Sequence, residues 1–149
     1  MRILGIDCGN VIFHGFGRSV PGSLENIRKI VQSKHFDKIY IVSRARIIAK
    51  YYYLARLKYI NFWNYTGISR NDIYFCRYDE EKAAICKQLN INYFIDDRFE
   101  VLRHLSMVDK KYALDPKLAK IKRFAKSNSD VVIVKSWTEL TPLLIRSSD

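Results

Sequence analysis

Short apolar runs alternate with stretches of helical periodicity along the whole of this chain. We expect strands at residues 2–7, 38–43, 73–76, 93–97, 111–114 and 131–134. We expect helices at residues 23–31, 45–60, 80–89, 99–106, 117–126 and 137–145. Strands that alternate with helices in this way predict a parallel sheet with helices on both faces. The expected fold class is therefore α/β, a three-layer Rossmann-like domain.

Length and composition bound the class of protein. The chain has 149 residues with no linker or internal repeat, so we expect a single domain over residues 1–149. No apolar run approaches the roughly 20 residues that a membrane helix needs. Polar residues interrupt the apolar N-terminal segment, which argues against a signal peptide. We expect a cytoplasmic protein with no membrane partner.

The three cysteines, Cys8, Cys76 and Cys86, have neither a disulfide pattern nor zinc-ligand spacing. Buried thiols explain all three. Cys8 is also a candidate nucleophile beside Asp7, although no nearby histidine pattern supports that role.

Positive charge is in excess and partly concentrated. The formal net charge is +11, from 26 Lys and Arg against 15 Asp and Glu. The segment from Arg103 to Lys126 is especially rich in basic residues. Such a charge attracts polyanions, nucleic acid above all. A solvated basic surface with no partner is the alternative interpretation.

Polar side chains lie at the ends of three expected strands and near the start of one expected helix. Asp7, Ser43 and the Asp96–Asp97 pair follow or close expected strands, and Lys82 lies near the start of an expected helix. Parallel strands share one carboxyl edge, where ligands bind in such folds. Carboxylates suit Mg²⁺, while a hydroxyl and an ammonium suit phosphoryl oxygens. An aspartate can also serve as a nucleophile that forms an acyl phosphate.

Four segments in this order resemble the motifs of the haloacid dehalogenase-like (HAD) superfamily of phosphohydrolases. They are IDCGNVI at 6–12, IVS at 41–43, the lysine at 82 and FIDDR at 94–98. The resemblance extends over about residues 2–140. It implies that Asp7 attacks phosphorus, that Ser43 hydrogen-bonds the phosphoryl oxygens, and that Lys82 orients Asp7 and offsets negative charge.

The same resemblance implies a Mg²⁺ site. Its ligands would be Asp7, Asp96 and Asp97, directly or through water, together with the main-chain carbonyl of Gly9. The implied activity is Mg²⁺-dependent hydrolysis of a phosphomonoester through an aspartyl phosphate on Asp7.

Gly9 departs from the commonest form of the first motif. A second aspartate usually stands there as general acid and base, and losing such a group typically costs roughly 10²–10⁴-fold in rate. The variant Asp-x-Gly-Asn-Val resembles a branch that includes working sugar-phosphate phosphatases. His14 is a candidate substitute, or else a structural or exposed histidine. Without a substitute, aryl phosphates should be cleaved far faster than alkyl phosphates.

The segments at 8–42 and 44–81 are too short for a large cap domain, so we expect a capless protein. Capless relatives often act on macromolecules or use a neighbouring subunit as a lid. Together with the positive charge, this favours a polyanionic substrate such as a nucleotide or a nucleic-acid end. A phosphoprotein remains an alternative.

Candidate substrate-binding residues flank these motifs. Asn10, Arg44 and Arg46 are the residues we expect to contact substrate, because arginines can fork onto a phosphate. Aromatic residues interleaved with bases follow them, at Tyr51, Tyr52, Tyr53, Tyr59, Phe62, Trp63 and Tyr65. Such a run can stack nucleobases, pack in the core or form a contact in a homo-oligomer.

Two other functions compete with the phosphohydrolase. One is a degenerate member of the superfamily that binds phosphate or nucleic acid without turnover, which Gly9 and the basic segment favour. The other is a nuclease of the ribonuclease H-like kind, because residues 3–7 also look like the opening of such proteins. The helix expected at 23–31, between the first two strands, argues against the nuclease.

Overall fold

The computed structural model describes residues 1–15 and 17–146. The strands are β1 (Ile3–Ile6), β2 (Lys38–Arg44), β3 (Ile73–Cys76), β4 (Tyr93–Asp96), β5 (Lys110–Leu114) and β6 (Val131–Val134). The helices are α1 (Ser23–Ser33), α2 (Ile47–Tyr59), α3 (Phe62–Thr66), α4 (Asp79–Gln88), α5 (Phe99–Leu102), α6 (Leu118–Phe124) and α7 (Trp137–Ile145). All six expected strands are confirmed, and no strand begins or ends more than one residue from its expected bound.

The six strands form one sheet in the order β3-β2-β1-β4-β5-β6. Every neighbouring pair is parallel, and Ile6 of β1 lies opposite Ile41 of β2 on one side and Ile95 of β4 on the other. The chain leaves β1 for β2 and β3, then returns to the far side of β1 as β4. This reversal of strand order opens a crevice at the carboxyl ends of β1 and β4, where ligands bind in such sheets.

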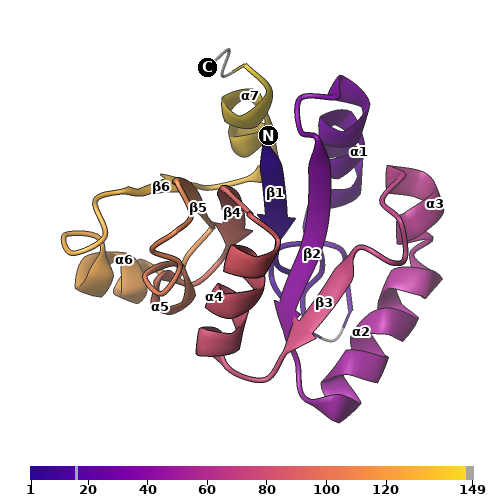
Figure 1. The fold of residues 1–149 in the computed structure, drawn as a ribbon, viewed down its shortest axis with the longest axis horizontal. Helices are drawn as coiled ribbons and strands as arrows, with labels where there is room; N and C mark the ends of the chain where they lie inside the picture. Colours follow the sequence, from indigo (N-terminus) through magenta and orange to yellow (C-terminus); the bar gives the residue numbers. More distant parts are fainter. Residues whose placement is uncertain (16, 147–149) are drawn as a thin grey trace.

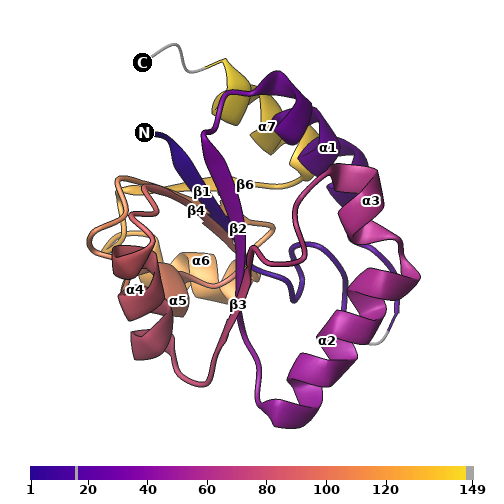
Figure 2. The same ribbon diagram turned by 45° about the vertical axis from the view of Figure 1, so that its right-hand side comes forward.

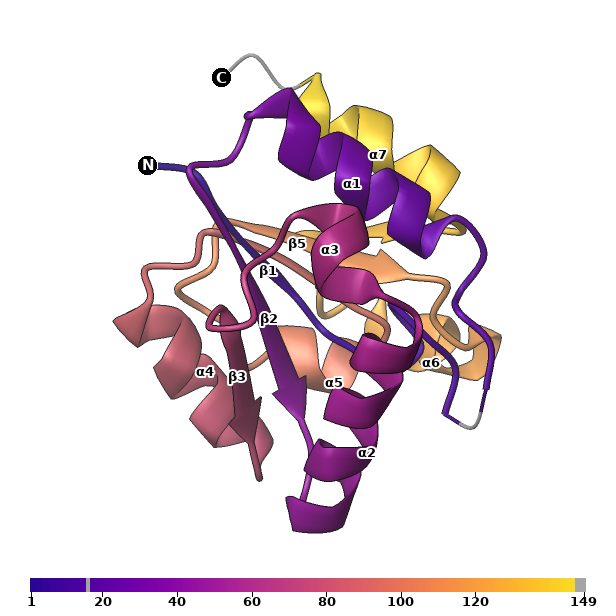
Figure 3. The same ribbon diagram turned by 90° about the vertical axis from the view of Figure 1, so that its right-hand side faces the viewer.

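Helices cover both faces of the sheet, which confirms the α/β fold (Figure 1). The side views show α1, α3 and α7 on one face and α4, α5 and α6 on the other (Figures 2 and 3). Helix α2 begins beyond the carboxyl end of β2 and extends past the sheet (Figure 3). No cap domain is evident over the carboxyl edge within the described residues.

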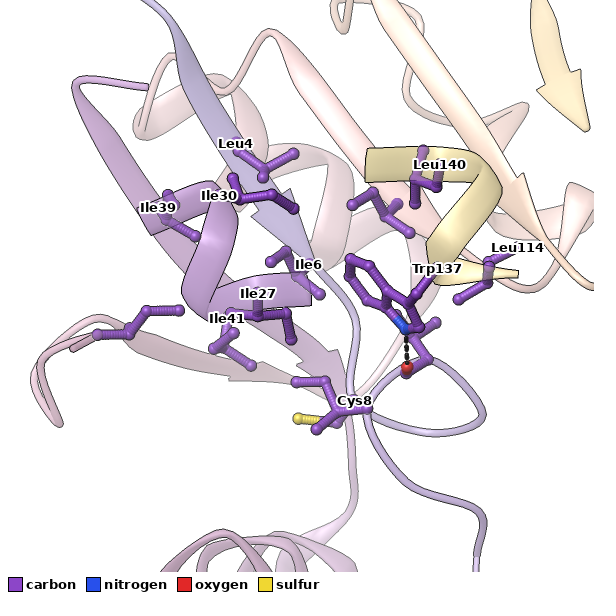
Figure 4. Close-up of a cluster of buried hydrophobic side chains, with 14 of the residues drawn as sticks. Leu4, Ile6, Cys8, Ile27, Ile30, Ile39, Ile41, Leu114, Trp137 and Leu140 are labelled. Carbon is purple, nitrogen blue, oxygen red and sulfur yellow. Dashed lines mark hydrogen bonds between the residues drawn. The ribbon is translucent and has the colours of Figure 1, made fainter. Parts of the chain in front are cut away.

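The core lies on both sides of β1, whose four residues are all buried. On the face of α1 and α7, Leu4 and Ile6 pack with Ile27, Trp137 and Leu140 (Figure 4). On the other face, Phe94 and Phe99 belong to a second cluster under α4 and α5. The Phe94 ring occupies the space that a Cβ at Gly5 would need, so glycine at this position lets β4 pack against β1.

The segment after β2 differs most from expectation. The helix expected at 45–60 ends at Tyr59, and a short helix that we did not expect, α3, follows at once. Asn61 separates them with a positive φ of 57°, and Gly67 ends α3 with a φ of 86°. Within α2 only Leu57 is buried, so most of the periodic apolar residues of this helix do not pack in the core. Of the aromatic run, Phe62 and Trp63 are in the core, whereas Tyr51 and Tyr59 are exposed.

Two further expectations concern the whole chain. The three cysteines are free and buried, as expected. Among the described residues, no helix combines the length and the apolar character needed to cross a membrane.

Candidate active site

The fold brings the polar strand ends together at the carboxyl edge of β1, β2 and β4. Asp7 directly follows β1, and its main-chain N–H donates to the carbonyl of Ile95 at 3.1 Å. Ser43 is the penultimate residue of β2 and is buried. Asp96 closes β4, with Asp97 next in the chain. Residues separated by up to ninety positions therefore meet because their strands are neighbours in the sheet.

Lys82 links these acids from the opposite direction. It lies on α4, is almost fully buried, and its Nζ donates to Asp7 Oδ1 at 3.1 Å and to Asp96 Oδ2 at 3.0 Å. A buried ammonium needs charged or hydrogen-bonded partners to offset its lost hydration. Burial alone would lower the pKa of Lys82, but the attraction of Asp7 and Asp96 outweighs it and raises that pKa. The lysine is therefore a fixed positive charge.

Three carboxylates share this single ammonium. Burial, reinforced by the charge of Asp96, raises the pKa of Asp7 to about 6 against the opposing influence of Lys82. Burial and the charges of Asp96 and Asp7 raise the pKa of Asp97 to about 8. Negative charge is thus crowded beyond what Lys82 offsets, which is the condition under which a second cation is stabilising.

The donor set fits Mg²⁺. Carboxylate oxygens of Asp7, Asp96 and Asp97 lie within 4.8 Å of one another. Hard oxygen ligands in a small cluster are what this ion prefers, with water completing its shell. Both oxygens of Asp96 also accept hydrogen bonds, Oδ1 from the N–H of Arg98 at 3.1 Å and Oδ2 from Lys82. These bonds fix the orientation of the Asp96 carboxylate.

A small cleft of about 180 Å³ opens over this cluster. Its lining residues come from β1 and its following loop, β2, α2, α4 and the end of β4: Asp7, Gly9, Asn10, Ser43, Arg44, Tyr53, Lys82, Asp97 and Arg98. Of the residues expected in the site from the sequence, the cleft therefore collects Asp7, Gly9, Asn10, Ser43, Arg44, Lys82 and Asp97. Asp96 lies behind them, fully buried.

The loop after β1 is tightly folded. The carbonyl of Cys8 accepts hydrogen bonds from the N–H groups of Val11 and Ile12 at 3.2 and 2.9 Å. Asn10 has a positive φ of 59°, in the left-handed region that asparagine tolerates. The Cys8 side chain points into the core, where burial raises the pKa of its thiol. A neutral, buried thiol makes Cys8 a core residue and not a nucleophile.

The arginines occupy two different places. Arg44 and Arg98 both lie on the cleft, and each places a guanidinium nitrogen 3.4 Å from Oδ1 of Asp79. Arg46, which we expected at the substrate phosphate, instead lines a neighbouring groove beside α2. Arg98 was not among the residues expected to contact substrate, although its place directly after Asp97 in the fourth motif was a usable signal.

His14 lies outside the cleft lining. It is exposed, and its Nδ1 is 3.3 Å from Oδ1 of Asn10, which does line the cleft. The residue that stands beside Gly9 is Tyr53 of α2, which the sequence indicated only as one member of an aromatic run. No motif marks Tyr53, because its position depends on how α2 packs against the loop after β1.

The basic segment from Arg103 to Lys126 is separate from the cleft. None of its basic residues lines the cleft as the described residues form it. Two of them are paired with acids, Lys111 with Asp130 at 2.6 Å and Lys120 with Glu100 at 2.7 Å. The basic residues that line the cleft are instead Lys82, Arg44 and Arg98.

Comparisons with known proteins agree on the fold. No protein-family model and no curated protein matches the chain by sequence. Among solved structures, the chain is similar to the D,D-heptose 1,7-bisphosphate phosphatase of Burkholderia thailandensis, with a TM-score of 0.68 and 14% identity over 99% of this chain and 100% of that one.

Two further structures place that likeness in context. A haloacid dehalogenase-like hydrolase of Burkholderia xenovorans matches with a TM-score of 0.59 and 15% identity, over 89% of this chain and 61% of that one. A de novo designed Rossmann 3x3 protein matches with a TM-score of 0.50 and 17% identity, over 100% of this chain and 96% of that one. The chain thus has the HAD-like fold that the motifs implied. A designed protein has the same layered architecture, so the fold alone does not determine the function, which must be argued from the site.

Proposed function

We propose that this protein is a Mg²⁺-dependent phosphohydrolase that cleaves phosphomonoesters through a phosphoryl group carried on Asp7. The observation that carries the proposal is the Lys82 ammonium, held 3.1 Å from Asp7 and 3.0 Å from Asp96 beside a cleft of about 180 Å³. Two of the structural neighbours are a phosphatase and a hydrolase, which supports the proposal.

The chemistry follows from the positions of the side chains. A carboxylate oxygen of Asp7 attacks phosphorus, the ester oxygen leaves with its electron pair, and water then hydrolyses the acyl phosphate. Lys82 holds Asp7 in place and offsets the charge on the phosphoryl oxygens. The Ser43 hydroxyl donates to one of those oxygens. Asp7, Asp96, Asp97 and the Gly9 carbonyl would hold Mg²⁺, which supplies further positive charge for the phosphoryl group.

For the substrate we propose a nucleotide or the phosphorylated end of a nucleic acid, in the cytoplasm. The cleft, at about 180 Å³, is smaller than the roughly 300–1,000 Å³ of ordinary small-molecule sites, so the organic part of the substrate must extend outside it. Asn10 and Arg44 on the cleft, and Arg46 further out, are the side chains proposed to contact the substrate. The net charge of +11 supports a polyanion.

The competing proposal is a degenerate protein that binds phosphate or nucleic acid without turnover. Gly9 favours it, because glycine supplies no proton-transfer group beside the nucleophile. The geometry around Lys82 is compatible with both, since a phosphate would be bound by the same groups that a phosphoryl transfer needs.

Hydrolysis of p-nitrophenyl phosphate with and without Mg²⁺ separates the two. We expect turnover that requires Mg²⁺ and disappears in Asp7→Asn, while Asp109→Asn, at an exposed acid outside the cleft, keeps it. An acid-quenched sample should carry one phosphoryl group by mass in the wild type and none in Asp7→Asn. Phosphate binding without turnover or phosphorylation would favour the degenerate protein.

A further inference from the structure

Tyr53 fills the space beside Gly9. A Cβ built on Gly9 would lie 3.1 Å from the Tyr53 hydroxyl oxygen, which is closer than most Cβ contacts in proteins. A side chain at position 9 would therefore displace this hydroxyl by a few tenths of an ångström. The Tyr53 ring is held edge-on against Phe13, with ring centroids 5.2 Å apart. A phenol hydroxyl therefore stands beside Gly9, on the cleft that Asp7 also lines, where the commoner form of the motif would project a carboxylate.

Tyr53 also stands between the cleft and a larger groove of about 1060 Å³. The groove is lined by residues of α2 and by Phe75, Cys76 and Arg77 at and after the end of β3. Helix α2 itself extends beyond the sheet (Figure 3). Tyr53 is common to the linings of the cleft and the groove. An ester whose phosphoryl group lies at Asp7 and whose organic group extends past Tyr53 therefore enters this groove.

The groove has a definite chemistry. Tyr52 and Phe75 add aromatic surface, and Ile47 and Ile48 at its rim are 77% and 85% exposed. Its basic residues are Arg46, Lys50 and Arg77. Its acid, Glu81, is engaged by the main-chain N–H of Arg77 at 2.9 Å. Aromatic surface beside positive charge suits a flat ring attached to an anionic group.

We propose that the Tyr53 hydroxyl donates a hydrogen bond to the leaving oxygen of a phosphomonoester whose ring-bearing organic group lies in the groove of α2. This inference rests on the proposed phosphohydrolase function. It assigns Tyr53 a role at the reacting oxygen, and it narrows the substrate to esters with an aromatic ring, the chemical class of the nucleotides.

The hydrogen bond acts on the step in which charge develops. As the bond between Asp7 and phosphorus forms, the bond from phosphorus to the leaving oxygen breaks, and its electron pair stays on that oxygen. The Tyr53 O–H stabilises this charge, and the alkoxide then takes a proton from solvent water. The benefit is large for alkyl esters, whose leaving oxygen is strongly basic, and small for p-nitrophenyl esters, whose oxygen is already a good leaving group.

Tyr53→Phe tests the hydroxyl. We expect kcat/KM for an alkyl phosphate to fall by roughly 10–100-fold, the usual effect of one hydrogen bond to a charged oxygen, and that for p-nitrophenyl phosphate to change by about 2-fold or less. Tyr59→Phe, at an exposed tyrosine on the same helix, should change neither. An equal loss on both esters, or no loss on either, would overturn the proposed role of Tyr53.

A paired substitution distinguishes the hydroxyl from general damage to the helix. The backbone of Gly9 has no positive φ, so the chain tolerates a side chain there once the hydroxyl is gone. We expect Gly9→Asp in the Tyr53→Phe background to regain part of the alkyl-phosphate activity, and Gly9→Asp alone to lose activity by displacing Tyr53. If Gly9→Asp raised alkyl-phosphate activity to the same extent with Tyr53 present, displacement of Tyr53 by a side chain at position 9 would be contradicted.

Ala49→Trp tests the groove, which Ala49 lines. We expect KM for adenosine 5′-monophosphate to rise at least about 5-fold, with kcat and the KM for glycerol 1-phosphate unchanged, because only the ring reaches the groove. Ala84→Trp, at an exposed site on α4, is the matched control. An unchanged KM for adenosine 5′-monophosphate would show that its ring does not bind in the groove. A dimer in sedimentation that Ala49→Trp dissociates would assign the groove to a second copy of the chain.

These results separate the inference from the proposed function. If the wild type shows no turnover that depends on Asp7, the phosphohydrolase fails, and the roles of Tyr53 and the groove fail with it. If turnover is present but the patterns for Tyr53→Phe and Ala49→Trp are absent, only the further inference fails.

Discussion

Lys82 sets the electrostatic condition of the site at the scale of single residues. It offers one positive charge to Asp7 and Asp96, and Asp97 adds a third carboxyl group to the same cluster. Burial first, and then the charges of the neighbouring carboxylates, raise the pKa of Asp97 to about 8 and that of Asp7 to about 6. The metal-free protein thus holds protons at neutral pH that the unfolded chain has already released.

These two raised pKa values determine how the stability of the metal-free protein depends on pH. Between about pH 4 and pH 8 the folded, metal-free protein binds more protons than the unfolded chain, so its free energy of unfolding falls as the pH rises through that window. We expect Asp97→Asn to raise Tm at pH 8 but not at pH 4. A gain of about 1–2 kcal/mol would raise Tm by roughly 2–6 °C.

Stabilisation of the wild type by Mg²⁺ should have the opposite dependence on pH. The ion must displace the proton of Asp97, so its stabilisation should be larger at pH 8 than at pH 6. Differential scanning fluorimetry with and without Mg²⁺ at both pH values measures this, with Asp109→Asn as the control. An Mg²⁺ shift in Asp97→Asn as large as in the wild type would contradict a role for Asp97 in holding the ion.

The residues that sequence analysis found and missed differ in one physical respect. Asp7, Ser43 and Asp97 end strands, and a parallel sheet brings strand ends to one edge whatever the details of packing. Tyr53 reaches the cleft from the middle of α2, and its position depends on the contact between its ring and Phe13. Local patterns carry no information about such a contact, so the sequence indicated the acids and not the phenol.

The same distinction holds at the scale of helices and strands. The bounds of β3, β6 and α7 match expectation residue for residue. A short apolar run marks β3, a β-branched run marks β6, and the Ser136 side chain caps the start of α7. The boundary between α2 and α3 was missed, because a single asparagine in the left-handed region interrupts an otherwise continuous helical pattern. The periodicity of α2 correctly predicted a helix, but most of the apolar residues that produce it are exposed to solvent.

Helix α7 supports the site from a distance. Trp137 is fully buried, and its Nε1 donates to the carbonyl of Val11 at 2.8 Å, in the loop that carries Gly9 and Asn10 (Figure 4). The last helix of the chain therefore holds the first loop. An unsatisfied buried carbonyl costs about 1–3 kcal/mol, so loss of this donor should destabilise the loop.

We predict that Trp137→Phe lowers both stability and activity. The lost donor and the smaller ring should lower Tm by roughly 4–10 °C, and the displaced loop should lower kcat on p-nitrophenyl phosphate. Trp63→Phe is the comparison, because Trp63 is a buried tryptophan of α3 outside this loop. It should lower Tm while leaving kcat of the folded protein unchanged. Equal effects of the two substitutions on kcat would contradict a specific link between α7 and the loop.

At the scale of the whole molecule, the basic residues of the cleft and those of the segment around α6 form two separate surfaces. The cleft has Lys82, Arg44 and Arg98, each already close to a carboxylate. The basic segment around α6 lies on the helical layer beyond β4 and contributes nothing to the cleft lining. A small phosphomonoester should therefore respond only to the first surface, whereas a long polyanion can contact both.

Charge reversal on α6 and its flanks tests this division. We expect Lys117→Glu, Lys122→Glu and Lys126→Glu together to weaken binding of a single-stranded polynucleotide and to flatten its dependence on salt, because fewer counterions are released. The KM for p-nitrophenyl phosphate should change by less than about 2-fold.

The control variant reverses the charge of Lys29, Lys34 and Arg70, exposed bases elsewhere on the surface, and changes the net charge equally. If both variants weaken polynucleotide binding to the same extent, net charge alone is responsible and the basic segment is no binding surface. If the α6 variant alone does so, while hydrolysis of the small ester persists, the two surfaces act independently and a polynucleotide substrate is held at both.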